Sequence, residues 1–210
     1  YYLSTSSNKP SENSSGWKNV NYSKGEKTIK LNNLNNGTYY LWVKDKAGNI
    51  SDTTDKSKFV VDKIDKEKPK CNISASGTKG NNNWYRGNIT LNLSYSDTGG
   101  SGVDKYGMGT SSSVSYNSKK KMTQTGDTLG ITYYGYVRDK AGNTNKCNIT
   151  VKKDSKAPTC NVKGSGTKGD NSWYRGNVDV RLNYSDSTSG VSNYGLSTSS
   201  SVTYNKSKSA

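Results

Sequence analysis

The sequence predicts an all-β protein made of β-sandwiches in tandem. Short segments in which apolar and polar residues alternate are separated by turn residues, and a long pattern of motifs recurs along the chain. In 89–95, for example, Ile, Leu, Leu and Tyr alternate with Thr, Asn and Ser, which gives a strand one apolar and one polar face. Because only 29% of the residues are hydrophobic, several small cores are more feasible than one large core.

The recurring motifs divide the chain into three copies of one unit. The segments 71–73, 84–88 and 39–49 are matched, respectively, by 160–162, 173–177 and 133–143. Short charged segments at 65–69 and 154–158 lie where the copies meet, and each ends in a proline that limits the freedom of the chain. We therefore expect the late part of a repeat at 1–68, a complete repeat at 69–158 and the early part of a repeat at 159–210.

Within the complete repeat, turn residues separate seven segments with strand character, and none has helical periodicity. We expect strands at roughly 70–75, 88–95, 103–108, 113–117, 119–125, 131–138 and 146–152. Seven short strands in one repeat predict an antiparallel sandwich of two sheets.

The turn between the last two strands has the sequence Asp-Lys-Ala-Gly-Asn in two copies, at 45–49 and 139–143. Gly48 and Gly142 can adopt the positive φ that a short hairpin requires. The carboxylates of Asp45 and Asp139 can accept hydrogen bonds from the backbone of the turn.

The segment 34–39 has the pattern of a tyrosine corner, in which a tyrosine anchors the edge of a sandwich. Tyr39 and its counterpart Tyr133 should therefore face inward. By alternation, Leu41 and Val43 should also point inward, and Tyr40 and Trp42 should lie on the outer face.

The complete repeat joins five motifs in a fixed order: Trp-Tyr-x-Gly-Asn, an alternating strand, Asp with Ser-Gly-Val, Tyr-x-Val-x-Asp-x-Ala-Gly-Asn, and a closing Asp-x-x-x-Pro. This combination resembles bacterial immunoglobulin-like repeats of secreted and cell-surface proteins, including adhesins and stalks. The resemblance covers nearly the whole chain, apart from an insertion around Asn8–Tyr22. It implies tandem seven-stranded immunoglobulin-like β-sandwiches with incomplete terminal copies. It also implies an extracellular or cell-surface stalk, spacer or filament segment.

Three cysteines suit this arrangement. Cys71 begins the complete repeat and Cys147 begins its last strand, both in register with inward residues, so we predict a disulfide between them. Cys160 is the counterpart of Cys71, and we expect its partner beyond Ala210. A bridge between Cys147 and Cys160, or free buried thiols, are the alternatives. A structural disulfide favours a location outside the reducing cytosol.

The chemistry of an enzyme is missing from the sequence. There is no histidine, which excludes histidine acid–base catalysis and histidine metal ligands, and no carboxylate pair recurs between copies. We expect no catalytic residue, cofactor or metal. The loop Asp97–Asp104 offers oxygen atoms for calcium, but its counterpart lacks the second carboxylate, so we expect Asp97 to cap the loop backbone.

Exposed aromatic residues are the candidate contacts. Trp84, Tyr85, Trp173 and Tyr174 would stack on sugar rings if they lay side by side at the surface, which makes a carbohydrate-binding module the first alternative function. Trp42 and Tyr136 belong to an outward stripe that would contact a partner or another filament. A second alternative is a polymerising filament subunit, in which the head of one molecule completes the tail of the next.

The formal net charge of +15 raises the question of nucleic acid. Most of the basic residues are lysines scattered over the repeats, whereas nucleic-acid readers concentrate charge and favour arginine. We expect no nucleic-acid partner and, for lack of a long apolar run, no membrane span in this segment. The expected partners are neighbouring repeats of the same or an identical chain, with surface glycans or host proteins as further candidates.

Overall fold

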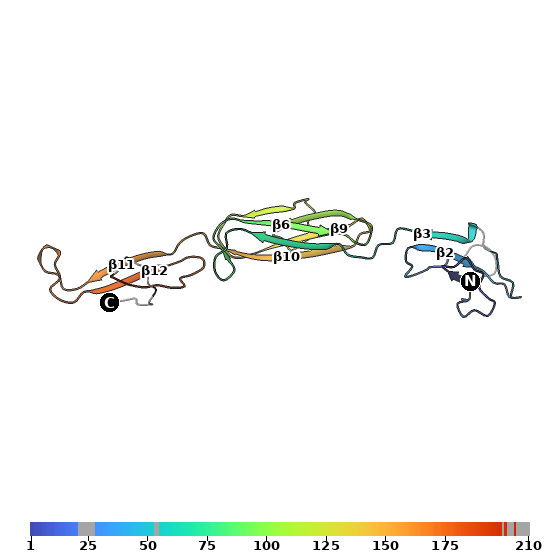
Figure 1. The fold of residues 1–210 in the computed structure, drawn as a ribbon, viewed down its shortest axis with the longest axis horizontal. Coiled ribbons are helices and arrows are strands. Elements are labelled where there is room, and N and C mark those ends of the chain that lie inside the picture. Colours follow the sequence, from blue (N-terminus) through green and yellow to red (C-terminus); the bar gives the residue numbers. More distant parts are fainter. Residues whose placement is uncertain (21–27, 53–54, 199, 201–203, 205–210) are drawn as a thin grey trace. The chain divides into compact units, whose positions relative to one another are not determined.

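The computed structural model describes residues 1–20, 28–52, 55–198, 200 and 204 (Figure 1). The chain divides into two compact units, residues 1–67 with 98–101 and residues 68–97 with 102–210. Both units are built from strands, and the helical elements among the described residues are two single turns of 3-10 helix, η1 (Asp55–Ser57) and η2 (Asp170–Ser172). Neither has the length or the apolarity that a membrane-crossing helix would need.

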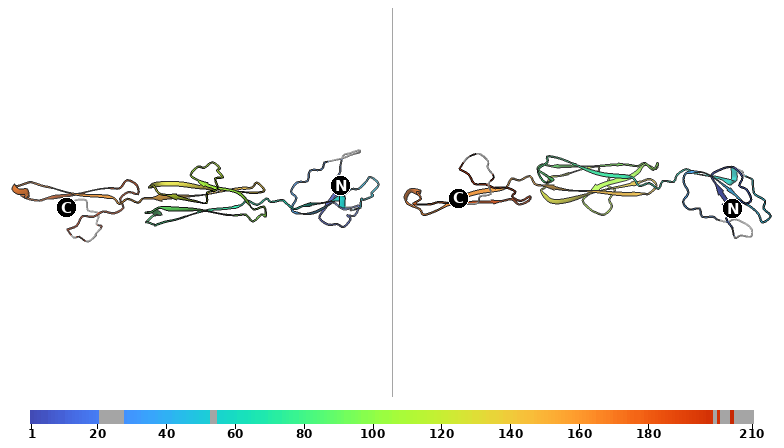
Figure 2. Two further views of the ribbon diagram at one scale, coloured as in Figure 1. Left: turned by 90° about the horizontal axis from the view of Figure 1, so that it is seen from above. Right: turned by 60° about the horizontal axis from the view of Figure 1, so that its bottom comes forward.

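Residues 70–153 form a sandwich of two sheets, whose layers Figure 2 shows edge-on. One sheet has the order β4 (Lys70–Ser76), β6 (Ile89–Ser96), β8 (Lys121–Gln124). The other has the order β5 (Trp84–Tyr85), β10 (Thr144–Lys153), β9 (Thr128–Asp139), β7 (Val103–Gly109). All neighbouring strands are antiparallel except β5 and β10, which pair in parallel.

The core of this sandwich follows the alternation in the sequence. Ile89 and Leu91 of β6 are completely buried, and Leu93 is 6% exposed, whereas the residues between them face solvent or are half-buried. Met108 and Tyr133 from the second sheet belong to the same buried cluster. The predicted two-faced strand is therefore confirmed.

One predicted strand is wrong. Residues 113–117 form no strand but belong to the loop 110–120, and Val114 is 63% exposed. The Asn117 side chain replaces the ladder here, because its Nδ2 donates to the Met108 carbonyl at 3.0 Å and its Oδ1 accepts from the Met108 amide at 3.2 Å. A side-chain amide can satisfy a strand edge in place of a backbone, and periodicity alone cannot detect this. The missed strand is β5, which has only two residues.

The first unit contains one sheet with the order β1 (Tyr2–Ser4), β2 (Gly37–Trp42), β3 (Lys58–Val61). Tyr39 forms the predicted corner: its hydroxyl donates to the Asn35 carbonyl at 2.9 Å and accepts from the Asn35 amide at 3.1 Å. The ring is 8% exposed and stacks on Phe59. Tyr133 is buried as well, but its hydroxyl donates to Gln124 Oε1 at 2.7 Å. In the second corner, the acceptor of the tyrosine hydroxyl is therefore a side chain and not a backbone carbonyl.

The predicted exposure of two residues beyond Tyr39 is wrong. Val43 is 53% exposed, whereas Trp42, expected outside, is 2% exposed. Tyr2 lies opposite Trp42 on the neighbouring strand, and Trp17 from the inserted loop packs edge-on against Tyr2. The outer face of this sheet is therefore covered by the loop, of which residues 21 and 22 lie outside the described part of the chain.

The remaining strands, β11 (Thr159–Ser165) and β12 (Asp179–Ser185), form a two-stranded hairpin. They correspond to β4 and β6, but among the described residues no second sheet covers them. Val162 is 53% exposed, whereas its counterpart Ile73 is 6% exposed. Leu182 is the hydrophobic residue of the hairpin that is buried.

Candidate functional site

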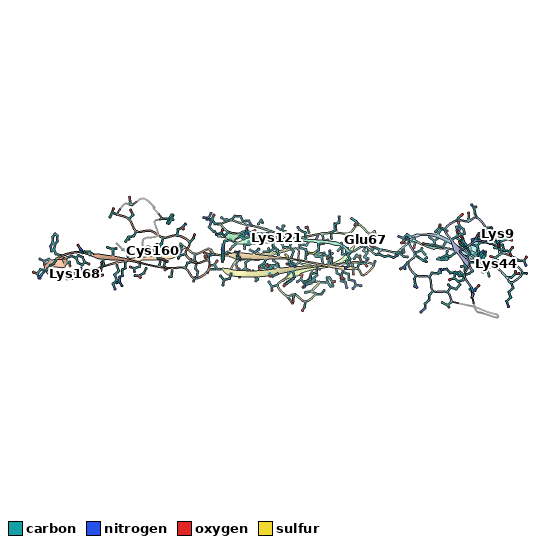
Figure 3. The ribbon with its side chains drawn as sticks, turned by 90° about the horizontal axis from the view of Figure 1, so that it is seen from below. Lys9, Lys44, Glu67, Lys121, Cys160 and Lys168 are labelled. Carbon is teal, nitrogen blue, oxygen red and sulfur yellow. A yellow bond between two sulfur atoms is a disulfide. The ribbon has the colours of Figure 1, made fainter. Side chains whose placement is uncertain are left out.

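The disulfide joins the first strand of the sandwich to the last. Cys71 and Cys147 are bonded, with Cα atoms 5.6 Å apart, and they belong to opposite sheets. Gly135 of β9 lies against the bridge, where a Cβ would overlap Leu93 and the Cys147 sulfur. The predicted pairing is confirmed, and a glycine in the middle of β9 makes room for it. Cys160 is free and exposed among the described residues (Figure 3).

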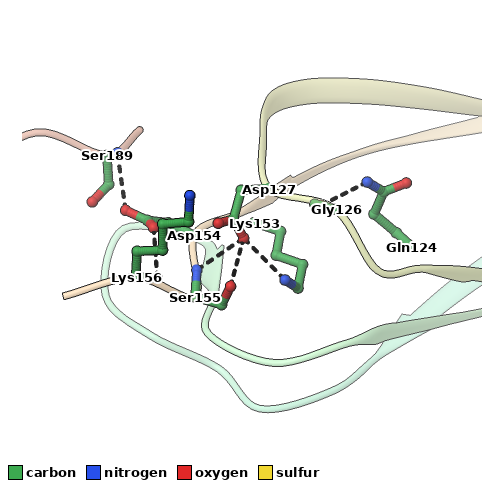
Figure 4. Close-up of polar contacts among 8 residues, drawn as sticks. All are labelled: Gln124, Gly126, Asp127, Lys153, Asp154, Ser155, Lys156 and Ser189. Carbon is green, nitrogen blue, oxygen red and sulfur yellow. Dashed lines mark hydrogen bonds and ion pairs between the residues drawn. The ribbon is translucent and has the colours of Figure 1, made fainter. Parts of the chain in front are cut away.

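A polar cluster closes the end of the sandwich where β10 leaves it (Figure 4). Asp127 Oδ1 accepts from Lys153 Nζ at 3.0 Å, from the Ser155 amide at 3.0 Å and from the Ser155 hydroxyl at 2.8 Å. The Lys153 side chain is only 3% exposed, and the Asp127 carboxylate is the counter-ion that compensates for its removal from water. Hydrogen bonds from Lys153 and then Ser155 lower the pKa of Asp127.

The first residue of each linker binds a loop further along the chain. Asp154 accepts from the Ser189 amide at 3.0 Å and from the Lys156 amide at 3.1 Å (Figure 4). Asp65 accepts in the same way from the Ser101 amide and from the Glu67 amide, each at 3.0 Å. The pKa values of Asp154 and Asp65 are lowered, first by hydrogen bonding with the side chains of Ser189 and Ser101 and then by these backbone amides. Both linker carboxylates therefore serve as fixed acceptors in their ionised form.

The loops that receive these contacts are capped by their own aspartates. Asp97 Oδ2 accepts from the Gly102 amide at 2.7 Å, and Asp186 Oδ1 accepts from the Gly190 amide at 2.8 Å. Asp97 thus caps the backbone as the sequence predicts. The sequence also contained the signal for the linker contact, because an aspartate begins both linkers, but it did not reveal which amide the carboxylate would bind.

The Asp-Lys-Ala-Gly-Asn turns have the predicted geometry. Gly48 and Gly142 have φ values of 95° and 99°. Asp45 accepts from the Asn49 amide and side chain, each at 2.8 Å, and the Asn49 side chain contributes most to the lowered pKa of Asp45. Asp139 accepts the equivalent hydrogen bonds from Asn143. Unlike Asp45, Asp139 is completely buried.

Three of the six candidate contact aromatics are wrong, because they are buried. Tyr85, Trp42 and Tyr136 are 4%, 2% and 2% exposed. Tyr85 points into the core, where its hydroxyl donates to the Ala75 carbonyl, and Tyr136 lies under the loop 110–120, where its hydroxyl donates to the Ser111 carbonyl. Alternation along a strand identified the outer face correctly for Tyr136 but could not anticipate the covering loop.

The other three aromatics differ in their surroundings. Trp84 is half-buried, with the Lys152 ammonium 5.0 Å from its ring centroid. Tyr174 has the Lys168 ammonium 3.6 Å from its centroid, and Trp173 is 75% exposed. Since Tyr85 is buried, Trp84 and Tyr85 do not form a sugar platform; sugar binding by Trp173 stays a prediction.

Comparison of the chain with known protein families, curated proteins and solved structures finds no significant match.

Proposed function

We propose that this chain is a segment of an extracellular stalk or spacer, built from immunoglobulin-like repeats that bear tension. The strand orders β4-β6-β8 and β5-β10-β9-β7 support this assignment, because immunoglobulin-like sandwiches pair their early and late strands in two such sheets. The Tyr39 corner and the short hairpin turns are further features of that class. A structural disulfide is compatible with an oxidising location.

The observation that carries the proposal is the position of the disulfide. The chain enters the sandwich on β4 and leaves it on β10, and Cys71 and Cys147 link these two strands. A pull on the ends of the repeat therefore loads the part of β10 that follows Cys147 and is then carried by the covalent bond, not by the strands between the two cysteines. The residues between the cysteines are shielded from extension.

Single-molecule force spectroscopy tests this mechanism. The cysteines are separated by 76 positions, so the oxidised repeat should extend by about 260 Å less on unfolding than the reduced repeat, at about 3.4 Å per residue. The Cys160→Ser variant serves as the control and should retain the difference. Equal extension with and without reductant would contradict a tension-bearing role for the bridge.

The register of the strands supports the alternative function, a filament subunit that polymerises head to tail, less well than it supports a stalk. Cys147 lies opposite Gly135, whereas in the first unit the β2–β3 pairing ends at Tyr40 and Lys58, and the residue before Lys58 is Ser57 of η1. A head that completed the tail of another molecule would thus offer a serine to Cys160. The stalk hypothesis needs no such joint.

A further inference from the structure

Two segments of the chain repeat one arrangement of carboxylates and backbone amides. The loop after Asp97 and the loop after Asp186 both contain Ser-Gly, at 101–102 and 189–190. In each loop the serine amide donates to the aspartate that begins the preceding linker, and the glycine amide donates to the loop's own aspartate. The two loops differ in length by one residue, so the pair of amides recurs although the loop as a whole does not.

A glycine with positive φ belongs to each of these loops. Gly102 and Gly190 have φ values of 76° and 79°, a backbone conformation that residues with a Cβ rarely adopt. In the second loop, Asp186 accepts from the Thr188 amide at 3.0 Å and from the Gly190 amide at 2.8 Å. The amides on both sides of Ser189 are therefore held within the loop, and the Ser189 amide is the one that binds a carboxylate from outside it.

That carboxylate belongs to Asp154, which is fixed to the sandwich. The Asp154 amide donates to the Tyr85 carbonyl at 2.9 Å, and the residue is 7% exposed. The next residue, Ser155, is tied to Asp127 through both its amide and its hydroxyl. The Asp154 carboxylate therefore extends from a rigid base, and its hydrogen bond from the Ser189 amide at 3.0 Å joins the sandwich to the loop that follows the hairpin (Figure 4).

The chain between the sandwich and the hairpin is exposed. Residues 155–158, which lead to β11, are all exposed, and Pro158 is the residue among them whose ring fixes φ. Structural units joined by an exposed linker move relative to one another unless an interface restrains them. A hydrogen bond that joins the two sides of the linker is such a restraint.

We propose that Asp154 is a latch that holds the hairpin in one orientation relative to the sandwich, and that residues 155–158 become a hinge when the latch opens. A hydrogen bond to an ionised group favours the closed state by about ten- to a hundredfold. The bond from the Ser101 amide to Asp65 has the same chemistry. The latch governs bending at the linker, whereas the disulfide governs extension of the sandwich, so either role can fail without the other.

Amide hydrogen exchange of the whole chain tests the latch bond. In the parent chain the Ser189 amide should exchange slowly. In Asp154→Asn it should exchange about tenfold faster, because a neutral amide oxygen accepts more weakly than a carboxylate. The Gly190 amide should keep its protection in both chains, since Asp186 holds it. The matched control is Asp179→Asn, which removes the same charge from an exposed strand residue and should change neither amide.

Residual dipolar couplings measure the hinge. In the parent chain, the amides of the sandwich and of the β11–β12 hairpin should fit one alignment tensor. In Asp154→Asn the hairpin should need a second tensor of smaller magnitude, while the couplings within the sandwich stay mutually consistent and show that it is folded.

The proposal is overturned if the parent chain already needs two tensors, or if its Ser189 amide is unprotected. It is also overturned if Asp179→Asn loosens the hairpin as much as Asp154→Asn does. Should Asp154→Asn unfold the sandwich, the exchange rate of the Ser189 amide and the number of tensors in the parent chain decide between a latched and a free hairpin.

Discussion

Gly107 of β7 lies directly beneath the carbonyl oxygen of Ser115, so a Cβ at this position would overlap the loop that crosses the sheet. In the first unit the arrangement is reversed. Tyr2 occupies the equivalent strand position, and Gly16 in the loop is the residue whose Cβ would meet the Tyr2 ring. The same loop thus covers the outer face in both units, with a glycine on one side of the contact in each case.

Replacing Gly107 with alanine should destabilise the sandwich by about 1–3 kcal/mol, the usual cost of overpacking. Urea unfolding of the variant and the parent chain measures this difference. Gly109→Ala is the matched control, because nothing lies within 4 Å of a Cβ there. If the two variants were equally stable, the loop would not be packed on β7 in solution.

Removing the disulfide should cost the sandwich about 4 kcal/mol, because the open chain gains conformational entropy when unfolded. The double variant Cys71→Ser with Cys147→Ser is compared with Cys160→Ser by chemical denaturation under oxidising conditions. The Cys160 variant should match the parent, since this thiol is exposed and unbonded in the described part of the chain. A comparable loss in both variants would contradict the assigned pairing.

The two Asp-Lys-Ala-Gly-Asn turns make the same hydrogen bonds at different depths. Asp139→Ala should cost about 1–3 kcal/mol, because it removes the buried acceptor of two hydrogen bonds from the half-buried Asn143. Asp45→Ala should cost much less, since water can replace the exposed carboxylate. Native-state hydrogen exchange resolves the two turns in one experiment, and equal losses of protection would refute the role of burial.

The polar cluster should make the fold sensitive to acid. Asp127 and Asp154 have pKa values below 3.8, their ordinary value. A lowered pKa in the folded state means that these groups stabilise the fold above about pH 4 and that this contribution is lost as the pH falls through the folded pKa. The midpoint temperature of thermal unfolding should therefore decrease as the pH is lowered from 6 to 2.

Asp127→Asn should lower the midpoint at neutral pH, because the buried Lys153 loses its ionised partner. The same variant should flatten the dependence below pH 4, since the titrating carboxylate is gone. Asp179→Asn controls for the loss of one negative charge at an exposed site. A variant whose acid dependence equals that of the parent would show that Asp127 does not titrate in this range.

The sequence by itself determined the all-β class, most strands, the disulfide and the hairpin turns. Alternation such as that of Ile89, Leu91 and Leu93 reports directly which face of a strand is buried, and a turn that needs positive φ selects glycine. These features depend on neighbours close along the chain, or, for the cysteines, on residues that both face inward. A local pattern of residue types is therefore enough to predict them.

Only the tertiary structure decided what covers the outer faces and where the linker carboxylates bind. Trp42 and Tyr136 are on the faces that alternation assigns to solvent, yet loops bury them. Asp154 binds Ser189 and Asp127 binds Lys153 across many intervening residues. Such contacts follow from the path of loops in space, and a local pattern of polar and apolar residues does not encode that path.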